Sequence, residues 1–220
     1  AKGAGIYIED VSNLLQFNLV NVEIDSNFSA SSSNNTVMRG IGIYILESSG
    51  NITGGYIKNN GYCTADDMQD DLCTTPDRGG GIFASGSEIT INNVVINNNW
   101  ADEEGAGVYF VNSHGTKLID VEISNNHDKG GVYISSTYGF ILQDCKIHSN
   151  DNYGIKNDYS SIKMLFVEVT DNGIGIESNE SDFYIQNVTI AGNSGFGITS
   201  SQSSVSREGD WNIVNSILWN

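Results

Sequence analysis

Short runs of alternating residues recur along the chain and are typical of β-strands. After an opening glycine, apolar residues flank an outward-facing aromatic one, as in Ile6-Tyr7-Ile8, Val108-Tyr109-Phe110 and Val132-Tyr133-Ile134. A second kind of run places pairs of apolar residues on one face: Phe17 and Leu19, Ile89 and Ile91, Phe140 and Leu142, Ile162 and Met164, Phe183 and Ile185. Alternating β-branched and aromatic residues predict strands, and no stretch has a helical period. We therefore predict an all-β fold.

These runs belong to a repeat with a fixed beginning and a fixed end. The repeats open at Gly5, Gly42, Gly81, Gly107, Gly131, Gly154, Gly175 and Gly197. Most of them close with Asn-Val-x-Ile-x-x-Asn or a variant, ending at Asn27, Asn60, Asn99, Asn126, Asn150, Asn172 and Asn193. Repeats of roughly 20 to 40 residues are typical of solenoids, in which each coil buries its apolar face against its neighbours. We predict one solenoid domain over residues 1–220, with about eight coils.

Asparagine and aspartate occupy the predicted bends between the strands of each coil. Both residues tolerate left-handed backbone conformations, and glycine adopts them without a steric penalty. Stacked coils bring equivalent residues to within about 4.8 Å of one another. We therefore expect the closing asparagines to form a structural ladder of amides that hydrogen-bond from coil to coil.

The openings Gly-Gly-Gly-Ile-Phe (79–83) and Gly-Ala-Gly-Val-Tyr (105–109), with the closings described above, carry a family resemblance. The chain resembles the right-handed parallel β-helix repeat of the pectate-lyase-like superfamily. It is also similar to the glycine-rich repeats of bacterial surface β-helix proteins, including chlamydial polymorphic outer-membrane proteins. The resemblance covers nearly the whole chain and implies the fold more strongly than any activity, because this fold carries lyases, hydrolases, epimerases and adhesins. It implies an extracellular or cell-surface location.

Two longer segments interrupt the repeat, at 28–39 and 61–78. The first is rich in Ser and Asn and is interpreted as a surface loop. The second contains Cys63 and Cys73, which suggest a disulfide in a chain of surface-protein type. Cys145 takes an inward position and is expected to be a buried free thiol.

The second segment is also acidic, and coil stacking should place it beside the next corner of the solenoid. The second segment contributes Asp66, Asp67, Asp70 and Asp71, and the next corner contributes Asp102, Glu103 and Glu104, with Asp128 and Asp151 on the following coils. Clustered carboxylates repel one another unless a cation neutralises them, and such oxygen-rich sites suit Ca²⁺. The alternative is a solvated acidic loop.

Aromatic residues recur at the outward position after the opening glycine: Tyr7, Tyr44, Phe83, Tyr109 and Tyr133, a row that stops at Lys156. An exposed stripe of this kind could stack on sugar rings or dock a protein partner. The alternative is a cross-strand ladder that stabilises the sheet or lies beneath a loop.

Catalysis would require a cluster of polar groups on one outward face. The candidates are Asp120, Glu122, Asp144, Lys146, His148 and Glu168. Carboxylates beside Lys or His could act as acid and base in glycan cleavage. The alternative is a favourable ladder of alternating charges. The motifs expected of polygalacturonases and alginate epimerases are missing from the sequence, so we expect no catalysis, with a polysaccharide lyase or hydrolase as the second hypothesis.

Charge narrows the choice of partner. Ten basic and 27 acidic residues give a net charge of −17, which disfavours nucleic acid and anionic membrane surfaces. No apolar run reaches the roughly 20 residues of a membrane span. We predict a segment of a longer surface scaffold or adhesin that binds a glycan or a surface protein. End-to-end self-association through open strand edges is a third hypothesis.

Overall fold

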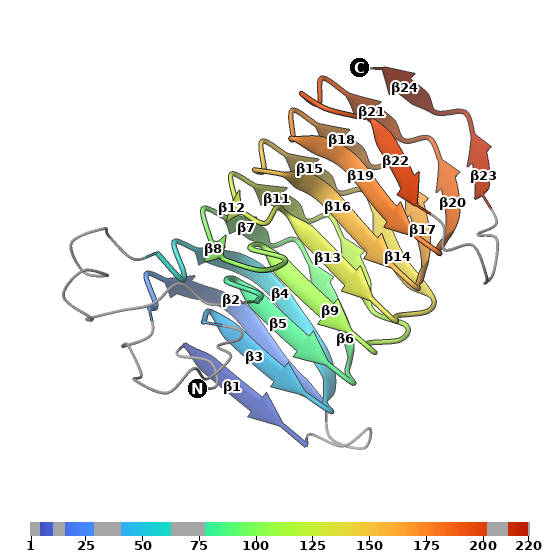
Figure 1. Ribbon diagram of the computed structural model, residues 1–220. Helices are drawn as coiled ribbons and strands as arrows, with labels where there is room; N and C mark the ends of the chain where they lie inside the picture. The colour runs from blue at the N-terminus through green and yellow to red at the C-terminus, as the bar shows by residue number, and fades with distance from the viewer. Residues whose placement is uncertain (1–4, 11–15, 29–40, 63–77, 202–210, 220) are drawn as a thin grey trace.

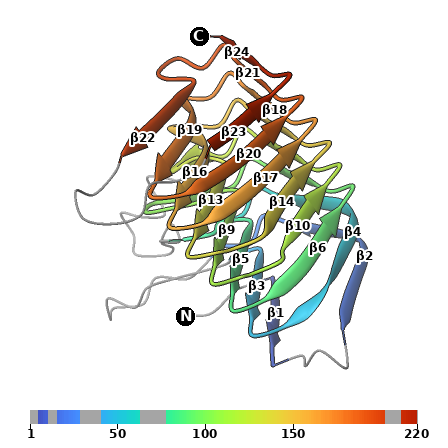
Figure 2. The same ribbon diagram turned by 90° about the vertical axis from the view of Figure 1, so that its right-hand side faces the viewer.

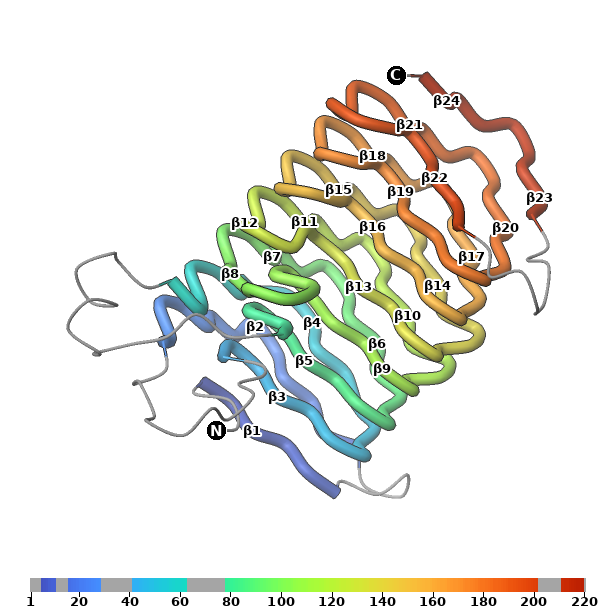
Figure 3. Tube along the Cα trace, viewed as in Figure 1, coloured from blue at the N-terminus to red at the C-terminus, as the bar shows by residue number. Residues whose placement is uncertain are grey.

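The computed structural model describes residues 5–10, 16–28, 41–62, 78–201 and 211–219, and these form a stack of β-coils (Figure 1). All strand pairs in this part of the chain are parallel. The chain path turns once per coil as it moves from the N-terminal to the C-terminal end (Figure 3). The predicted all-β solenoid of parallel strands is confirmed.

Two long sheets run along the stack, and their strands follow one another in the same order (Figure 2). The first sheet contains β1 (Ile6–Glu9), β3 (Ile43–Leu46), β5 (Ile82–Ser85), β9 (Val108–Val111), β13 (Val132–Ser135), β16 (Tyr153–Asp158), β19 (Ile174–Asn179) and β22 (Ile198–Ser201). In the second sheet, β2 (Phe17–Asp25) and β4 (Ser49–Lys58) each span two rows of strands.

The two rows separate after β4. One row contains β6 (Glu88–Asn92), β10 (Lys117–Ile119), β14 (Phe140–Gln143), β17 (Ser161–Leu165), β20 (Asp182–Gln186) and β23 (Trp211–Val214). The other contains β7 (Val95–Asn97), β11 (Glu122–Ser124), β15 (Lys146–His148), β18 (Glu168–Thr170), β21 (Thr189–Ala191) and β24 (Ile217–Trp219). A short pair, β8 (Trp100–Ala101) and β12 (His127–Asp128), lies at one corner of the stack.

The core is built from equivalent apolar residues stacked in register. Ile82 pairs with Val108, and Val108 with Val132, and all three are fully buried. The second sheet repeats this arrangement with Ile96, Ile123 and Ile147. Because each inward residue lies on its counterpart in the next coil, the core is continuous along the axis.

Each coil bends at three points where one residue has a positive φ angle. The three columns are residues 10, 47, 86, 112, 136, 159 and 180; residues 21, 54, 93, 120, 144, 166, 187 and 215; and residues 26, 59, 98, 125, 149, 171 and 192. Asn, Asp, Ser and Gly predominate because they tolerate this conformation. Phe166, with a φ of 55°, is the bulky exception in the second column.

The asparagine ladder forms as predicted and satisfies every polar atom of its central members. Asn126 Oδ1 accepts hydrogen bonds from the Asn99 backbone N and Nδ2, at 3.1 and 3.0 Å. Asn126 Nδ2 donates to Asn150 Oδ1 at 2.9 Å and to the Ile96 carbonyl at 3.2 Å. The same pattern links Asn27, Asn60, Asn99, Asn126, Asn150, Asn172 and Asn193.

A second internal ladder, which the sequence analysis did not predict, follows the first bend. From the second member onward, a buried hydroxyl accepts a hydrogen bond from the backbone N–H of the equivalent residue in the preceding coil. Its members are Ser48, Ser87, Ser113, Thr137, Ser160 and Ser181. The two ladders therefore join the coils at two of the three corners.

Cys145 is buried and free, as predicted. Its Sγ lies 3.2 Å from the Gln143 carbonyl and 3.3 Å from that of Leu118. Burial raises the pKa of this thiol to about 11, so it stays protonated and unreactive at neutral pH. Cys63 and Cys73 lie outside the described residues, so their disulfide stays a prediction.

Candidate functional site

The predicted aromatic stripe is present as a stack of rings, but most of it is covered. Tyr7 and Tyr44 stack at 5.3 Å between ring centroids, Tyr44 and Phe83 at 5.1 Å, and Tyr109 and Tyr133 at 4.6 Å. Only Tyr7 is well exposed, at 39%, whereas the other four rings are 1–6% exposed and form a buried cluster with Tyr153. The alternative role, a ladder that stabilises the sheet, therefore describes these four residues better than a ligand-binding stripe.

Charged side chains lie over the end of this aromatic cluster. Lys156 Nζ lies 5.0 Å from the Tyr133 ring centroid and 3.4 Å from Glu104 Oε1. The Tyr133 hydroxyl donates to Asp158 Oδ2 at 2.6 Å, and burial and this carboxylate raise the pKa of Tyr133. Burial also raises the pKa of Glu104, partly offset by Lys156. The Lys156 ammonium thus offsets the Glu104 carboxylate beside the rings, whereas the Asp158 carboxylate accepts hydrogen bonds from Tyr133 and Asn179.

The predicted calcium site divides between described and undescribed parts of the chain. Asp66, Asp67, Asp70 and Asp71 lie outside the described residues. Glu103 Oε2 pairs with Arg78 Nε at 3.1 Å, while Glu104 pairs with Lys156. Across the described ranges, no three His, Cys, Asp or Glu side chains come together as metal ligands. Calcium binding therefore stays a prediction that depends on the segment 63–77.

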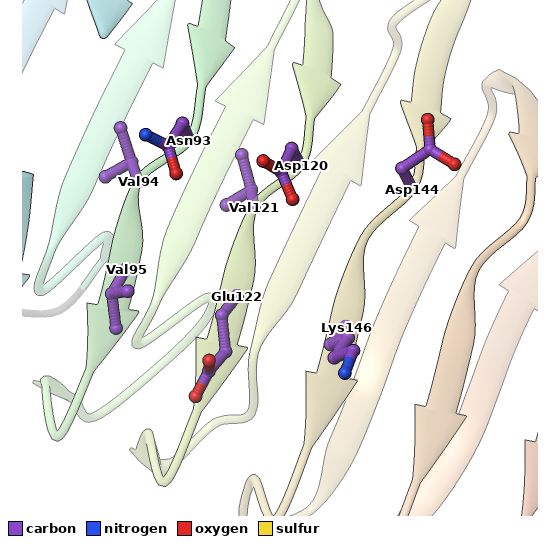
Figure 4. Close-up of a pocket in the computed structure, with 8 residues that line it drawn as sticks. All are labelled: Asn93, Val94, Val95, Asp120, Val121, Glu122, Asp144 and Lys146. Atoms are coloured by element: carbon purple, nitrogen blue, oxygen red, sulfur yellow. The ribbon is translucent and has the colours of Figure 1, made fainter. Parts of the chain in front are cut away.

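The catalytic candidates lie on neighbouring strands, as the repeat predicted. Glu122 pairs in register with Lys146, and Lys146 with Glu168, while His148 lies beside Ser124. Asp120 and Asp144 lie at the adjoining bends, and a groove of about 240 Å³ is lined by Asn93, Val94, Val95, Asp120, Val121, Glu122, Asp144 and Lys146 (Figure 4).

Glu122, Lys146 and Glu168 are in register, but the ion pair in this group does not follow the ladder of alternating charges considered above. Glu122 Oε1 lies 3.4 Å from His148 Nε2, and within the described coils no ion pair joins Glu122 to Lys146. The Glu122 and His148 side chains are 44% and 32% exposed. The groove thus brings three carboxylates and one lysine to one open face, with His148 beside it.

A further group of side chains, which the sequence analysis did not single out, lies at the corner after the asparagine ladder. The Trp100 ring stacks on His127 at 4.3 Å and packs against Tyr62 at 4.6 Å. A groove of about 610 Å³ beside them is lined by Ser26, Phe28, Asn59, Tyr62, Asn98 and Trp100. Trp100 and His127 each directly follow a ladder asparagine in the sequence. This shared position is difficult to recognise because the segments that come after it differ in length.

A chain of hydrogen bonds runs along the base of this corner. Asn59 Nδ2 donates to Asp25 Oδ1 at 2.8 Å, and Asn98 Nδ2 donates to Asn59 Oδ1 at 2.6 Å. Asn98 Oδ1 then lies 2.9 Å from His127 Nε2, and it accepts from this nitrogen in the tautomer that carries the proton there. His127 Nδ1 lies 3.2 Å from Asp151 Oδ2. These successive hydrogen bonds orient the side-chain amides of Asn59 and Asn98 and the ring of His127.

Comparison with known proteins agrees with the observed architecture. A family model described as the right-handed β-helix region matches residues 1–177. No curated protein matches the chain. Among the described residues, no helix is long and apolar enough to cross a membrane. The matched region includes most of the stacked coils and the three surfaces described above, and the chain therefore belongs to the right-handed β-helix family.

Proposed function

We propose that the chain is a non-catalytic scaffold or adhesin module of an extracellular or cell-surface protein. The observation that supports this proposal is the division of each coil into two parts. Internal hydrogen-bond ladders join two of the three corners, and on the outside of one of them, next to the asparagine ladder, aromatic and polar side chains line a groove open to solvent. Such a scaffold holds surface groups at fixed spacing, and binding is a natural use of that arrangement.

The test is a search for turnover. The protein is incubated with plant, algal and bacterial polysaccharides, with added calcium, and soluble products are analysed by mass spectrometry. We expect no released oligosaccharides. Release from any substrate would contradict the proposal, and the chemistry of the new chain ends would distinguish a lyase from a hydrolase.

The second candidate function is polysaccharide cleavage, and the groove in Figure 4 favours it. Carboxylates and a Lys or His on one face can supply the acid and base for glycan cleavage. If products are released, Lys146→Ala and His148→Ala should abolish release while leaving the unfolding midpoint unchanged, because both side chains face outward. The matched control is Lys163→Ala, on the neighbouring row of strands, which should have no effect.

A further inference from the structure

At the corner next to the asparagine ladder, equivalent residues of successive coils form a column in which one member is glycine. The residue that follows the ladder asparagine is Phe28, Gly61, Trp100, His127 and then Asp151 on successive coils. Backbone hydrogen bonds hold these residues in register, since the N–H groups of Gly61, Trp100 and His127 donate to the carbonyls of Asn27, Asn60 and Asn99 at 2.8, 2.9 and 2.9 Å. Gly61 contributes no side chain to this column, and the next residue, Tyr62, packs against Trp100 at 4.6 Å, so the open position lies between Phe28 and Tyr62.

Aromatic rings border this gap on both sides. Phe28 is 59% exposed, and no ring contact joins it to Tyr62 in the described part of the corner. Tyr62, 50% exposed, leans against Trp100, and the far face of Trp100 is occupied by His127. The groove at the gap has a volume of about 610 Å³, within the size range of small-molecule sites. A flat ring could enter between Phe28 and Tyr62.

The base of the groove offers hydrogen bonds of both kinds. Each carboxamide carries two N–H donors and two acceptor lone pairs. Asn59 uses one donor on Asp25 and one acceptor for Asn98, and Asn98 uses one donor on Asn59 and one acceptor for His127. Counting the partners among the described residues, one N–H and one lone pair remain on each amide. Hydroxyl groups, which donate and accept, suit this pairing better than a ketone carbonyl, an ammonium group or a hydrocarbon ring does.

Charge restricts the ligand further. Asp25 ends the hydrogen-bond chain on one side of the groove and also pairs with Lys58 Nζ at 3.5 Å, Glu23 pairs with the same lysine, and Asp151 lies beyond His127, in a protein whose net charge is −17. An anionic ring would be repelled by these carboxylates. We propose that this groove binds one uncharged sugar ring of a glycan, with its C–H faces between Phe28 and Tyr62 and its hydroxyls on Asn59 and Asn98. The inference builds on the scaffold proposed above.

Titration with uncharged oligosaccharides tests this site. Cellohexaose, mannohexaose, xylohexaose and laminarihexaose are added to the protein in a Trp211→Phe, Trp219→Phe background, so that Trp100 is the reporting fluorophore. At least one of them should give a saturable change in emission. Tyr62→Ala and Trp100→Ala should each weaken that binding about tenfold, as measured by calorimetry.

Phe166→Asn is the matched control, because Phe166 is 57% exposed on a different corner. Its binding should equal that of the parent protein. If Trp100→Ala lowers the unfolding midpoint, Tyr62→Ala decides, since it leaves the Trp100–His127 stack in place. The proposal is overturned if no uncharged oligosaccharide binds, if neither variant weakens binding, or if oligogalacturonate or choline binds more tightly. Product release in the turnover assay would contradict the scaffold alone and leave this site standing.

Discussion

Asn126 shows how a single buried side chain can hold three coils together. It accepts two hydrogen bonds from Asn99 and donates one to Asn150 and one to Ile96. A buried amide with all its partners is stabilising, whereas removing it leaves those partners unsatisfied. The position, one residue beyond a left-handed bend at Asn125, is what turns the side chain into the stack.

Replacing Asn126 with Ala should lower the free energy of unfolding by about 3 kcal/mol, because buried donors and acceptors on both neighbouring coils lose their partner. Denaturant unfolding of the purified variant measures this change. Asn27→Ala, at the end of the ladder, is the control and should cost only about 1 kcal/mol, since Asn27 is partly exposed. Equal losses at the two positions would show that the ladder does not act as a continuous unit.

Glu104 should give the fold a specific dependence on pH. Burial raises its pKa in the folded state, so the folded protein binds this proton more tightly than the unfolded chain does. The contribution of protonated Glu104 to the free energy of unfolding is therefore largest below the pKa of the unfolded chain. It is lost as the pH rises through the raised pKa of the folded state.

The measurement compares the parent protein with Glu104→Gln by denaturant unfolding from pH 4 to pH 8. The parent should lose stability relative to the variant as the pH rises. A difference that stays constant with pH, or that changes in the opposite direction, would contradict this role of Glu104.

At the scale of the strand, the opening glycines are required because the backbone of the next coil and a ladder asparagine lie very close to them. A Cβ atom on Gly107 would lie 2.5 Å from the Gly131 carbonyl oxygen and 3.0 Å from Asn126 Nδ2. Gly107 has no positive φ, unlike the glycines at the bends. The strand therefore begins with glycine because the next coil and the asparagine ladder occupy the space of a side chain.

Gly107→Ala should therefore destabilise the protein by about 3 kcal/mol, since the backbone must move to admit the methyl group. Thermal and denaturant unfolding measure this loss. A conservative exchange in the same strand, Val108→Ile, tests the core instead and should cost about 1 kcal/mol. Unchanged stability in Gly107→Ala would mean that the coils can separate locally without loss.

The strands and the asparagine ladder could be predicted because they depend on local chemistry repeated in every coil. The burial of Tyr44, Phe83, Tyr109 and Tyr133 could not, because alternation assigns a residue to a face of the sheet and says nothing of what covers that face. The serine and threonine ladder was missed because single hydroxyl residues are common everywhere. The stack of Trp100 on His127 was missed because the two residues align only when coils of unequal length are superimposed.

For the whole molecule, each coil contacts mainly its two neighbours, so local stability should vary along the axis. Hydrogen exchange followed by mass spectrometry should show the slowest amides in β9, β13 and their partners near the middle. Exchange should be faster in β1 and β22–β24, where fewer neighbours are packed and the side chains of Trp211, Ile213 and Leu218 are 40–49% exposed. Uniform protection along the chain would mean that the coils open only together.

The asparagine ladder also determines where the chain can change in length. In the sequence, residues 28–41 and 61–80 separate a ladder asparagine from the next opening glycine, and so does the much shorter 151–153. Strand pairing fixes the rise of the stack from coil to coil, so this rise does not depend on the length of the segment at this corner. Doubling the length of a flexible loop costs only about 0.6 kcal/mol. Over evolution, insertions and deletions can therefore accumulate here while every other coil keeps its place. The same corner would accept a foreign peptide grafted by design.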